Sequence, residues 1–206
     1  MSKHSVESTP VYRLNSRHAQ RENTRRQLLD AGLRLVAERG FAGATTAAVA
    51  QECGKAHGTV FVHFRSREVL VEELVGRIGE AMSLRLAATD SETPDVATVL
   101  DAHLEALAAH EVLYARLLGE ATTLPPAARA RVFALQSGVA WRLRAACERE
   151  VAAGTARALD PVMLANTWIA LTNHYLMHRD LFAPKASVVA THGAQLKAHL
   201  LQTLRP

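Results

Sequence analysis

Hydrophobic residues recur at helical spacing along most of the chain. Between Thr24 and Arg39 they fall at i, i+3 and i+4 and form one apolar face. The same periodicity continues from Ser66 to about Ala88, and it predicts further helices over residues 95–109, 111–122, 126–153, 161–180 and 186–204. Few segments are rich enough in β-branched or aromatic residues to predict strands. The pattern therefore predicts an all-α protein.

A shorter pattern lies between residues 45 and 64. Val49 faces inward in its first half, and Val60 and Phe64 share a face in its second half. Gly54 separates the two halves at a position where a helix end needs a positive φ. Two short helices joined by such a turn form a helix-turn-helix, although a helical hairpin without a function has the same spacing.

Composition and charge favour a nucleic-acid ligand for this segment. The chain has 206 residues, of which 49% are hydrophobic and only 5% aromatic, so its core is built mainly of Ala, Leu and Val. Residues 1–70 contain 11 Lys and Arg against 6 Asp and Glu, whereas residues 71–206 contain 13 against 14. No carboxylate occurs between Lys55 and Arg67. Basic charge confined to the helix-turn-helix part is typical of a DNA-binding head on a neutral body.

Other classes of protein are disfavoured. The sequence has no P-loop, no dinucleotide-binding glycine fingerprint and no GxSxG elbow, so we expect neither an enzyme nor a cofactor. The two cysteines form no CxxC pair, the first twenty residues do not form a secretory signal, and no apolar run spans a bilayer. We therefore expect a cytoplasmic protein with no membrane contact. His174 and His178, four apart, could share a metal, but packing or surface roles are favoured and no metal site is predicted.

The segment from Thr24 to about Leu74 resembles the DNA-binding domain of the TetR/AcrR family of bacterial transcriptional regulators. The resemblance rests on the run LLDAGLRLVAERGFAGATTAAVAQECGKAHGTVFVHFRSREVLVEEL. This run contains the Gly40-Phe41 step, the paired threonines, a Gly-Thr-x-Phe-x-His-Phe recognition helix and the Ser-Arg-Glu start of a fourth helix. Residues 1–20 are polar, and Pro10 interrupts an early helix, so we expect an irregular, flexible basic tail there. For the rest of the chain the family implies two parts: a helix-turn-helix domain (21–68) and a helical ligand-binding and dimerisation domain (69–206).

The resemblance and the residue chemistry together predict the DNA contacts. Ala56 and Phe61 can read bases by shape and by contact with thymine methyl groups, whereas His57 can hydrogen-bond a purine edge. The family often has Lys at the position of His57, Tyr at Phe61 and His at Val62, so a usual hydroxyl contact to phosphate is missing here. The predicted DNA-binding residues are Arg25, Thr45, Thr46, Ala56, His57, Thr59, Phe61, His63, Arg65 and Arg67.

For the remainder of the chain the family implies a small-molecule effector and a homodimer formed by the last two helices. It implies a repressor that binds a palindromic double-stranded DNA operator and is released by the effector. Two alternatives stay open: a protein that acts mainly through a protein partner, and a regulator that responds to metal or pH. Candidate effector contacts are the aromatic or polar residues set among Ala and Leu, together with one Leu and one Met: His103, Leu107, Tyr114, Phe133, Trp141, Asn166, Asn173, His174 and Met177.

Overall fold

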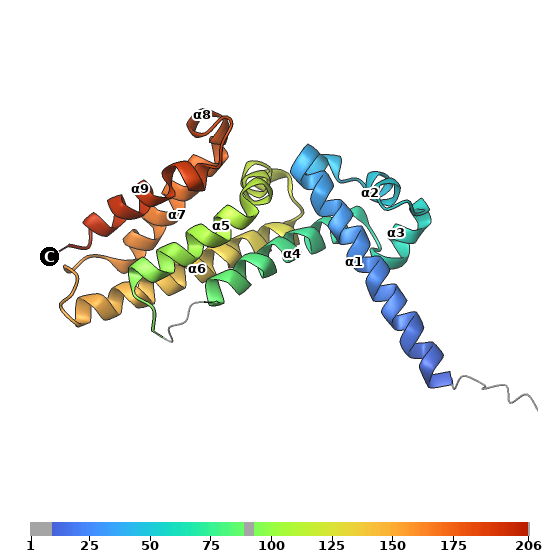
Figure 1. Ribbon diagram of the computed structural model, residues 1–206, viewed down its shortest axis with the longest axis horizontal. Helices are drawn as coiled ribbons and strands as arrows, with labels where there is room; N and C mark the ends of the chain where they lie inside the picture. The colour runs from blue at the N-terminus through green and yellow to red at the C-terminus, as the bar shows by residue number, and fades with distance from the viewer. Residues whose placement is uncertain (1–9, 89–92, 206) are drawn as a thin grey trace, which may run out of the picture.

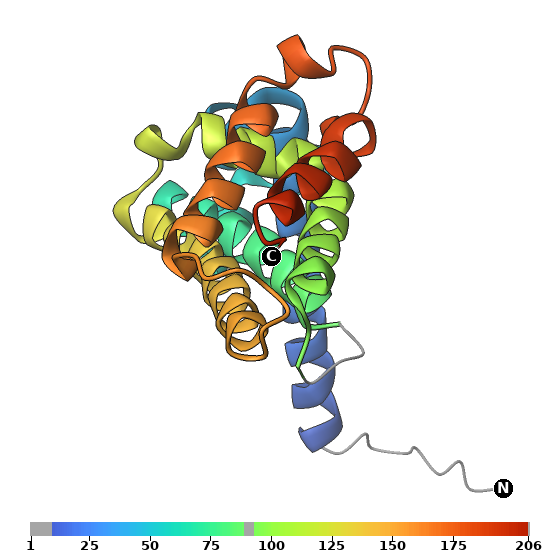
Figure 2. The ribbon, with the colours of Figure 1, turned by 90° about the vertical axis from the view of Figure 1, so that its left-hand side faces the viewer.

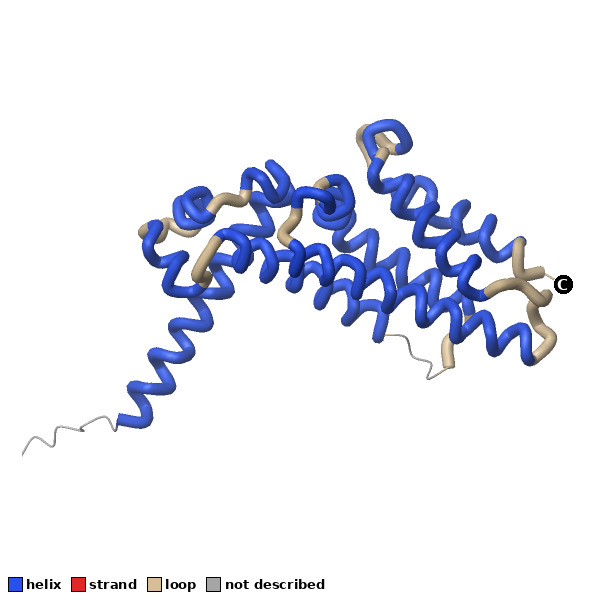
Figure 3. Tube along the Cα trace, turned by 180° about the vertical axis from the view of Figure 1, so that it is seen from behind, coloured by secondary structure: helices blue, strands red, loops and turns tan. Residues whose placement is uncertain are grey.

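The computed structural model describes residues 10–88 and 93–205, and within these ranges it contains helices and loops but no strand (Figure 1; Figure 3). The elements are α1 (Pro10–Gly43), α2 (Thr46–Glu52), α3 (His57–His63), α4 (Arg67–Ala87), α5 (Val96–Gly119), the 3-10 turn η1 (Ala121–Thr123), α6 (Pro126–Ala152), α7 (Pro161–Met177), α8 (Arg179–Phe182) and α9 (Val188–Gln202). This agrees with the predicted all-α class. No helix of the described residues is both long and apolar enough to cross a membrane.

The first helix begins earlier than the sequence pattern predicts. It starts at Pro10 and not at Thr24, so the expectation of an irregular tail is wrong for residues 10–20, and residues 1–9 lie outside the described part. Proline is tolerated in the first turn of a helix because no partner is needed there for its missing N–H. Thr24 lies within the helix, where its hydroxyl donates to the carbonyl of Gln20 (3.0 Å). Figure 1 shows this end of α1 extending away from the rest of the molecule.

The other predicted helix boundaries are close to those observed. Gly40 leaves the helical conformation (φ 74°, ψ 178°), as predicted, and the next residue, Phe41, is buried. The helices predicted over 95–109 and 111–122 form one element, α5, with a kink at His110 (φ −128°, ψ 20°). The helix predicted over 161–180 ends at Met177, and the short helix α8 follows it.

The helices form a head and a body that share α4. The head consists of α1–α3 and the first turns of α4, around a core that includes Leu28, Val49, Val60 and Phe64, all fully buried. The body consists of the rest of α4 with α5–α9, and Trp168 of α7 is the largest of its fully buried side chains. Figure 2 looks along the body, with α5, α7 and α9 side by side. α4 is one continuous helix that belongs to both parts.

Candidate nucleic-acid interface and ligand pockets

The helix-turn-helix is held by local contacts. The hydroxyl of Thr45 caps α2 by accepting from the backbone N–H of Ala48 (3.1 Å). At the other end of α2, Gly54 has a φ of 61°, and the following Lys55 N–H donates to the carbonyl of Ala50 (2.9 Å). The position of Gly54 in the sequence predicts this turn. The turn places α3 across α2.

The outward face of α3 exposes apolar side chains. Phe61 is 47% exposed and Val62 is 65% exposed, and His57 and Arg65 are also exposed. Large apolar side chains on a surface helix in a basic head suit contact with base edges and thymine methyl groups. Val62 was not among the residues predicted to contact DNA. Its position directly after Phe61 on a short helix was the sequence feature that could have indicated it.

Two of the predicted DNA contacts are bonded to each other. The Thr46 hydroxyl lies 3.0 Å from Nε2 of His57, which links the first turn of α2 to the first turn of α3. The His57 ring also packs edge-on against Phe61, with 5.2 Å between ring centroids. His57 is therefore held in one orientation before any ligand binds, which reduces the entropy lost on recognition.

His63 is half-buried at the end of α3. Its Nδ1 atom is buried and has no hydrogen-bond partner among the described residues. Burial lowers the pKa of His63, and the nearby Arg21 and Arg25 lower it further. At neutral pH its ring is thus uncharged and can contact a phosphate only as a hydrogen-bond donor or through water.

Two of the three arginines predicted to contact DNA have partners within the protein. Arg67, at the start of α4, donates to the carbonyl of Phe41 (2.9 Å). Arg25 pairs with Glu73 of α4 (2.7 Å) and lies over the ring of Phe64 (5.3 Å). A guanidinium has five N–H groups, so either arginine can keep its internal bond and still donate to a phosphate.

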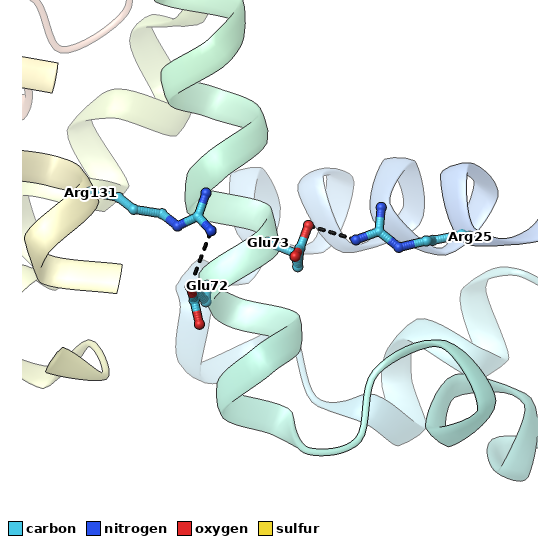
Figure 4. Close-up of polar contacts among 4 residues, drawn as sticks. All are labelled: Arg25, Glu72, Glu73 and Arg131. Atoms are coloured by element: carbon cyan, nitrogen blue, oxygen red, sulfur yellow. Dashed lines mark hydrogen bonds and ion pairs between the residues drawn. The ribbon is translucent and has the colours of Figure 1, made fainter. Parts of the chain in front are cut away.

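Adjacent carboxylates on α4 pair with opposite parts of the molecule. Figure 4 shows Glu73 paired with Arg25 of α1 and Glu72 paired with Arg131 of α6 (3.1 Å). The Arg131 guanidinium occupies the space that a side chain at position 76 would need. A Cβ added to Gly76 would lie 2.6 Å from Arg131 Nη1. α4, which joins the two parts, thus forms one ion pair with the head and another with α6.

A pocket of about 430 Å³ lies at the ends of α5 and η1 and the start of α6. We call it the α6 pocket. Its walls are mostly apolar, with polar groups from three side chains. It is lined by Leu118, Ala121, Thr122, Arg129, Val132, Phe133 and Gln136. Of the nine predicted effector contacts only Phe133 lines this pocket.

A partly buried chain of polar side chains leads from the α6 pocket towards α7. The Gln136 amide lies within reach of the Tyr114 hydroxyl (3.5 Å), and that hydroxyl donates to Asn173 Oδ1 (3.3 Å). Burial raises the pKa of Tyr114, so its hydroxyl keeps its proton at neutral pH. Tyr114 and Asn173, both predicted contacts, therefore lie behind the pocket and connect to it through Gln136, a residue that the sequence analysis did not select.

A second pocket, of about 540 Å³, lies where the body meets the head and is lined in part by Ala37, Arg116, Glu120, Met177 and Arg179. Met177 is the one predicted effector contact found there. The structure does not bring the remaining predicted contacts together. Leu107 and His103 are buried in the core, whereas Trp141, Asn166 and His174 are exposed.

His103 is part of the body core. Its Nδ1 accepts a hydrogen bond from the indole N–H of Trp168 (2.9 Å), and burial lowers its pKa from 6.5 to about 4. The ring is therefore neutral in the folded protein at pH 7, and protonation would break the bond from Trp168.

This pKa predicts a loss of stability in acid. Below pH 6.5 the unfolded chain binds a proton at His103 that the folded chain does not bind until about pH 4, so stability falls as the pH falls through this range. The difference corresponds to about 3–4 kcal/mol at ~1.4 kcal/mol per pKa unit. Denaturation curves at pH 7 and pH 4.5 should show a smaller difference in unfolding free energy for His103→Gln than for the unsubstituted protein. Equal pH dependence of the two proteins would contradict this role.

His174 of α7, His178 just after that helix and His192 of α9 lie in an aromatic cluster. The rings of His174 and His178 are 4.8 Å apart, and Phe182 stacks on Tyr175 at 4.1 Å. His192 of α9 lies 3.0 Å from the carbonyl of Phe182 through Nε2. No group of three or more His, Cys, Asp or Glu placed to hold a metal ion occurs in the part of the chain that the structure describes.

The outer faces of α7 and α9 are open to solvent. Val162 and Met163 of α7 are 43% and 62% exposed. On α9, Ala190, Ala194 and Ala198 are exposed at intervals of four. Small residues at this spacing let another helix approach closely, and the exposed Val and Met add apolar surface.

Comparison with known proteins identifies the head. Residues 28–74 match the family described as bacterial regulatory proteins, tetR family. The HTH-type transcriptional regulator BetI of Serratia proteamaculans (strain 568) is 36% identical over 74 residues, which are 34% of this chain and 37% of BetI. This match thus spans little more than a third of that relative.

Solved structures resemble the fold over most of the chain. A TetR family transcriptional regulator from Agrobacterium tumefaciens has a TM-score of 0.73 at 20% identity, covering 89% of this chain and 99% of its own. FadR from Bacillus subtilis, solved in complex with stearoyl-CoA, has a TM-score of 0.65 at 19% identity, covering 87% and 98%. At these identities the likeness concerns the fold.

Proposed function

This chain belongs to the TetR family of bacterial regulatory proteins, and from that premise we propose that it is a homodimeric transcriptional repressor released from its operator by a small molecule. Each subunit inserts α3 into a major groove. The pair reads a palindrome whose half-sites lie one helical turn apart, or a multiple of it.

The observation that supports this most directly is the surface of α3. It exposes His57, Phe61 and Val62, and no carboxylate lies between Lys55 and Arg67. Apolar groups and hydrogen-bonding groups without acids can approach bases between two phosphate backbones. Thr45, Thr59, Arg65 and Arg67 supply groups for the phosphates on either side, and such contacts give affinity that falls with salt.

The proposed dimer uses the exposed faces of α7 and α9. Two such helices from each subunit form a four-helix bundle in which residue faces are self-complementary about a two-fold axis. The exposed Val162 and Met163, together with the alanine series of α9, fit that packing. A symmetric dimer places two copies of α3 at a fixed separation, which is the quantity that an effector has to change.

We place the effector in the α6 pocket. Its walls suit a largely apolar molecule, and Arg129 and Gln136 suit a polar or anionic group at one end. B. subtilis FadR, a protein with the same fold, was solved in complex with stearoyl-CoA, which makes that compound a reasonable first probe. If the effector favours one head separation and DNA another, each ligand weakens the binding of the other by the same factor.

Selection of duplexes from a random DNA library by the purified protein tests this function. We expect an enriched palindrome, bound with nanomolar affinity and more weakly at higher salt. Addition of stearoyl-CoA, and then of other amphipathic compounds, to that complex screens for release. Failure to enrich any sequence would reject the repressor and favour a protein that acts through a protein partner.

A further inference from the structure

Two side chains at the end of α5 contact backbone groups of the head. The Glu120 carboxylate accepts hydrogen bonds from the N–H groups of Phe41 (3.1 Å) and Ala42 (3.2 Å). One turn earlier, Arg116 donates to the carbonyl of Glu38 (3.2 Å). The charges are complementary, because the last carbonyls of a helix are partly negative and the N–H groups after its break are partly positive. Figure 1 shows the end of α5 beside this end of α1.

The backbone of the head is shaped to receive the Glu120 carboxylate. Gly40 has a φ of 74°, which turns the next two N–H groups towards the body. A Cβ at Gly40 would lie 2.2 Å from Glu120 Oε1, so any other residue would occupy the place of the carboxylate. The peptide of Phe41 is also held from its other side, since Arg67 donates to its carbonyl (2.9 Å). Glycine is thus required at position 40 for two reasons: its φ is positive, and a Cβ would occupy the place of the Glu120 carboxylate.

The Glu120 backbone lies in the turn between α5 and η1, next to residues that line the α6 pocket. Its N–H donates to the carbonyl of Arg116 (3.0 Å), and its own carbonyl accepts from the N–H (2.9 Å) and the hydroxyl (2.8 Å) of Thr123. Three neighbouring residues line the α6 pocket, Leu118, Ala121 and Thr122, whereas Glu120 itself lines the second pocket, where the body meets the head. Because Glu120 is bonded into this turn at both ends, a ligand that moves the neighbouring residues of the α6 pocket can also move the carboxylate.

We propose that Glu120 is a positioning residue for DNA binding, which fixes the orientation of the head relative to the body and transmits occupancy of the α6 pocket to it. This inference rests on the proposed repressor function and concerns its regulation. In the ligand-free protein the Glu120 contacts hold the head in the orientation that fits the operator. A ligand in the α6 pocket withdraws the carboxylate, and the heads lose their fixed separation. Nonspecific binding, which depends on phosphate contacts of a single head, does not need this contact.

The test is Glu120→Gln. The side chain keeps its size, but one carboxylate oxygen becomes an NH₂ group that cannot accept a hydrogen bond. Hydrogen exchange followed by NMR should show protection at the amides of Phe41 and Ala42 falling by about tenfold, the scale of losing one bond to a charged acceptor. Affinity for the duplex selected by the unsubstituted protein should fall by about tenfold, while affinity for a random duplex of equal length stays unchanged.

Glu150→Gln is the matched control. Glu150 accepts from the backbone N–H of Val96 (2.7 Å), so it makes the same kind of contact between two helices of the body and does not touch the head. Both DNA affinities should be unchanged in this variant.

The outcomes separate the two proposals. If the unsubstituted protein selects no sequence, the repressor function is rejected, and this inference is rejected with it. If it selects a duplex that Glu120→Gln binds equally well, or if the amides of Phe41 and Ala42 keep their protection in that variant, the repressor function stands and the role of Glu120 is rejected. Equal weakening by Glu150→Gln would also reject it, because the effect would then be one of general stability.

Discussion

Phe61→Glu should abolish operator binding and leave the protein folded. Phe61 is 47% exposed on α3, so replacing it removes little from the core. The new carboxylate would lie in the major groove between two phosphate backbones, next to His57. Placing like charges together at an interface costs several kcal/mol, and we expect affinity for the selected duplex to fall by about a hundredfold or more. Fluorescence anisotropy with the labelled duplex measures this directly.

Leu84→Glu provides the control for this substitution. Leu84 is 73% exposed on the body portion of α4, so the same change of an apolar surface residue to an acid is made away from α3. Operator affinity in this variant should stay within about twofold of the original, since a charge beyond the ~10 Å Debye length is largely screened. Similar losses in both variants would mean that net charge, and not the position on α3, decides binding.

Trp168→Ala should produce the largest loss of stability. The side chain is fully buried in α7, and truncating a buried Trp costs about 3–5 kcal/mol through lost burial and the cavity left behind. The substitution also leaves His103 Nδ1 without the indole N–H that bonds it at 2.9 Å, and an unsatisfied buried acceptor adds about 1–3 kcal/mol. Urea denaturation at one fixed protein concentration gives the difference in unfolding free energy.

The other tryptophan serves as the comparison. Trp141 of α6 is 67% exposed, so Trp141→Ala should change the unfolding free energy by less than about 1 kcal/mol. Trp168→Phe preserves most of the volume and should lose mainly the hydrogen bond, about 1–3 kcal/mol. If Trp168→Phe were as stable as the original protein, the contact with His103 would have no energetic importance.

Features that depend on neighbouring residues could be predicted from the amino-acid sequence alone. The turn at Gly54 and the end of the helical pattern at Arg39, just before Gly40, each depend on backbone conformation within a few residues, so residue type and position were enough to predict them. The all-α class followed in the same way from periodicity. The start of α1 was the exception, because Pro10 permits the first turn of a helix as readily as it interrupts one, and local pattern could not decide between the two.

Contacts between residues far apart in the sequence could be known only from the folded chain. Glu120 contacts the amides of Phe41 and Ala42 across 79 and 78 positions of sequence, and Trp168 bonds His103 across 65. Helical periodicity indicates which face of a helix is buried but not which helix covers it. The sequence therefore could not distinguish which aromatic and polar residues of the body line a pocket and which do not. The structure separated them into core, surface and pocket wall. It also gave Glu120 a position that no local pattern indicates, because the carboxylate depends on where the end of α5 lies against α1.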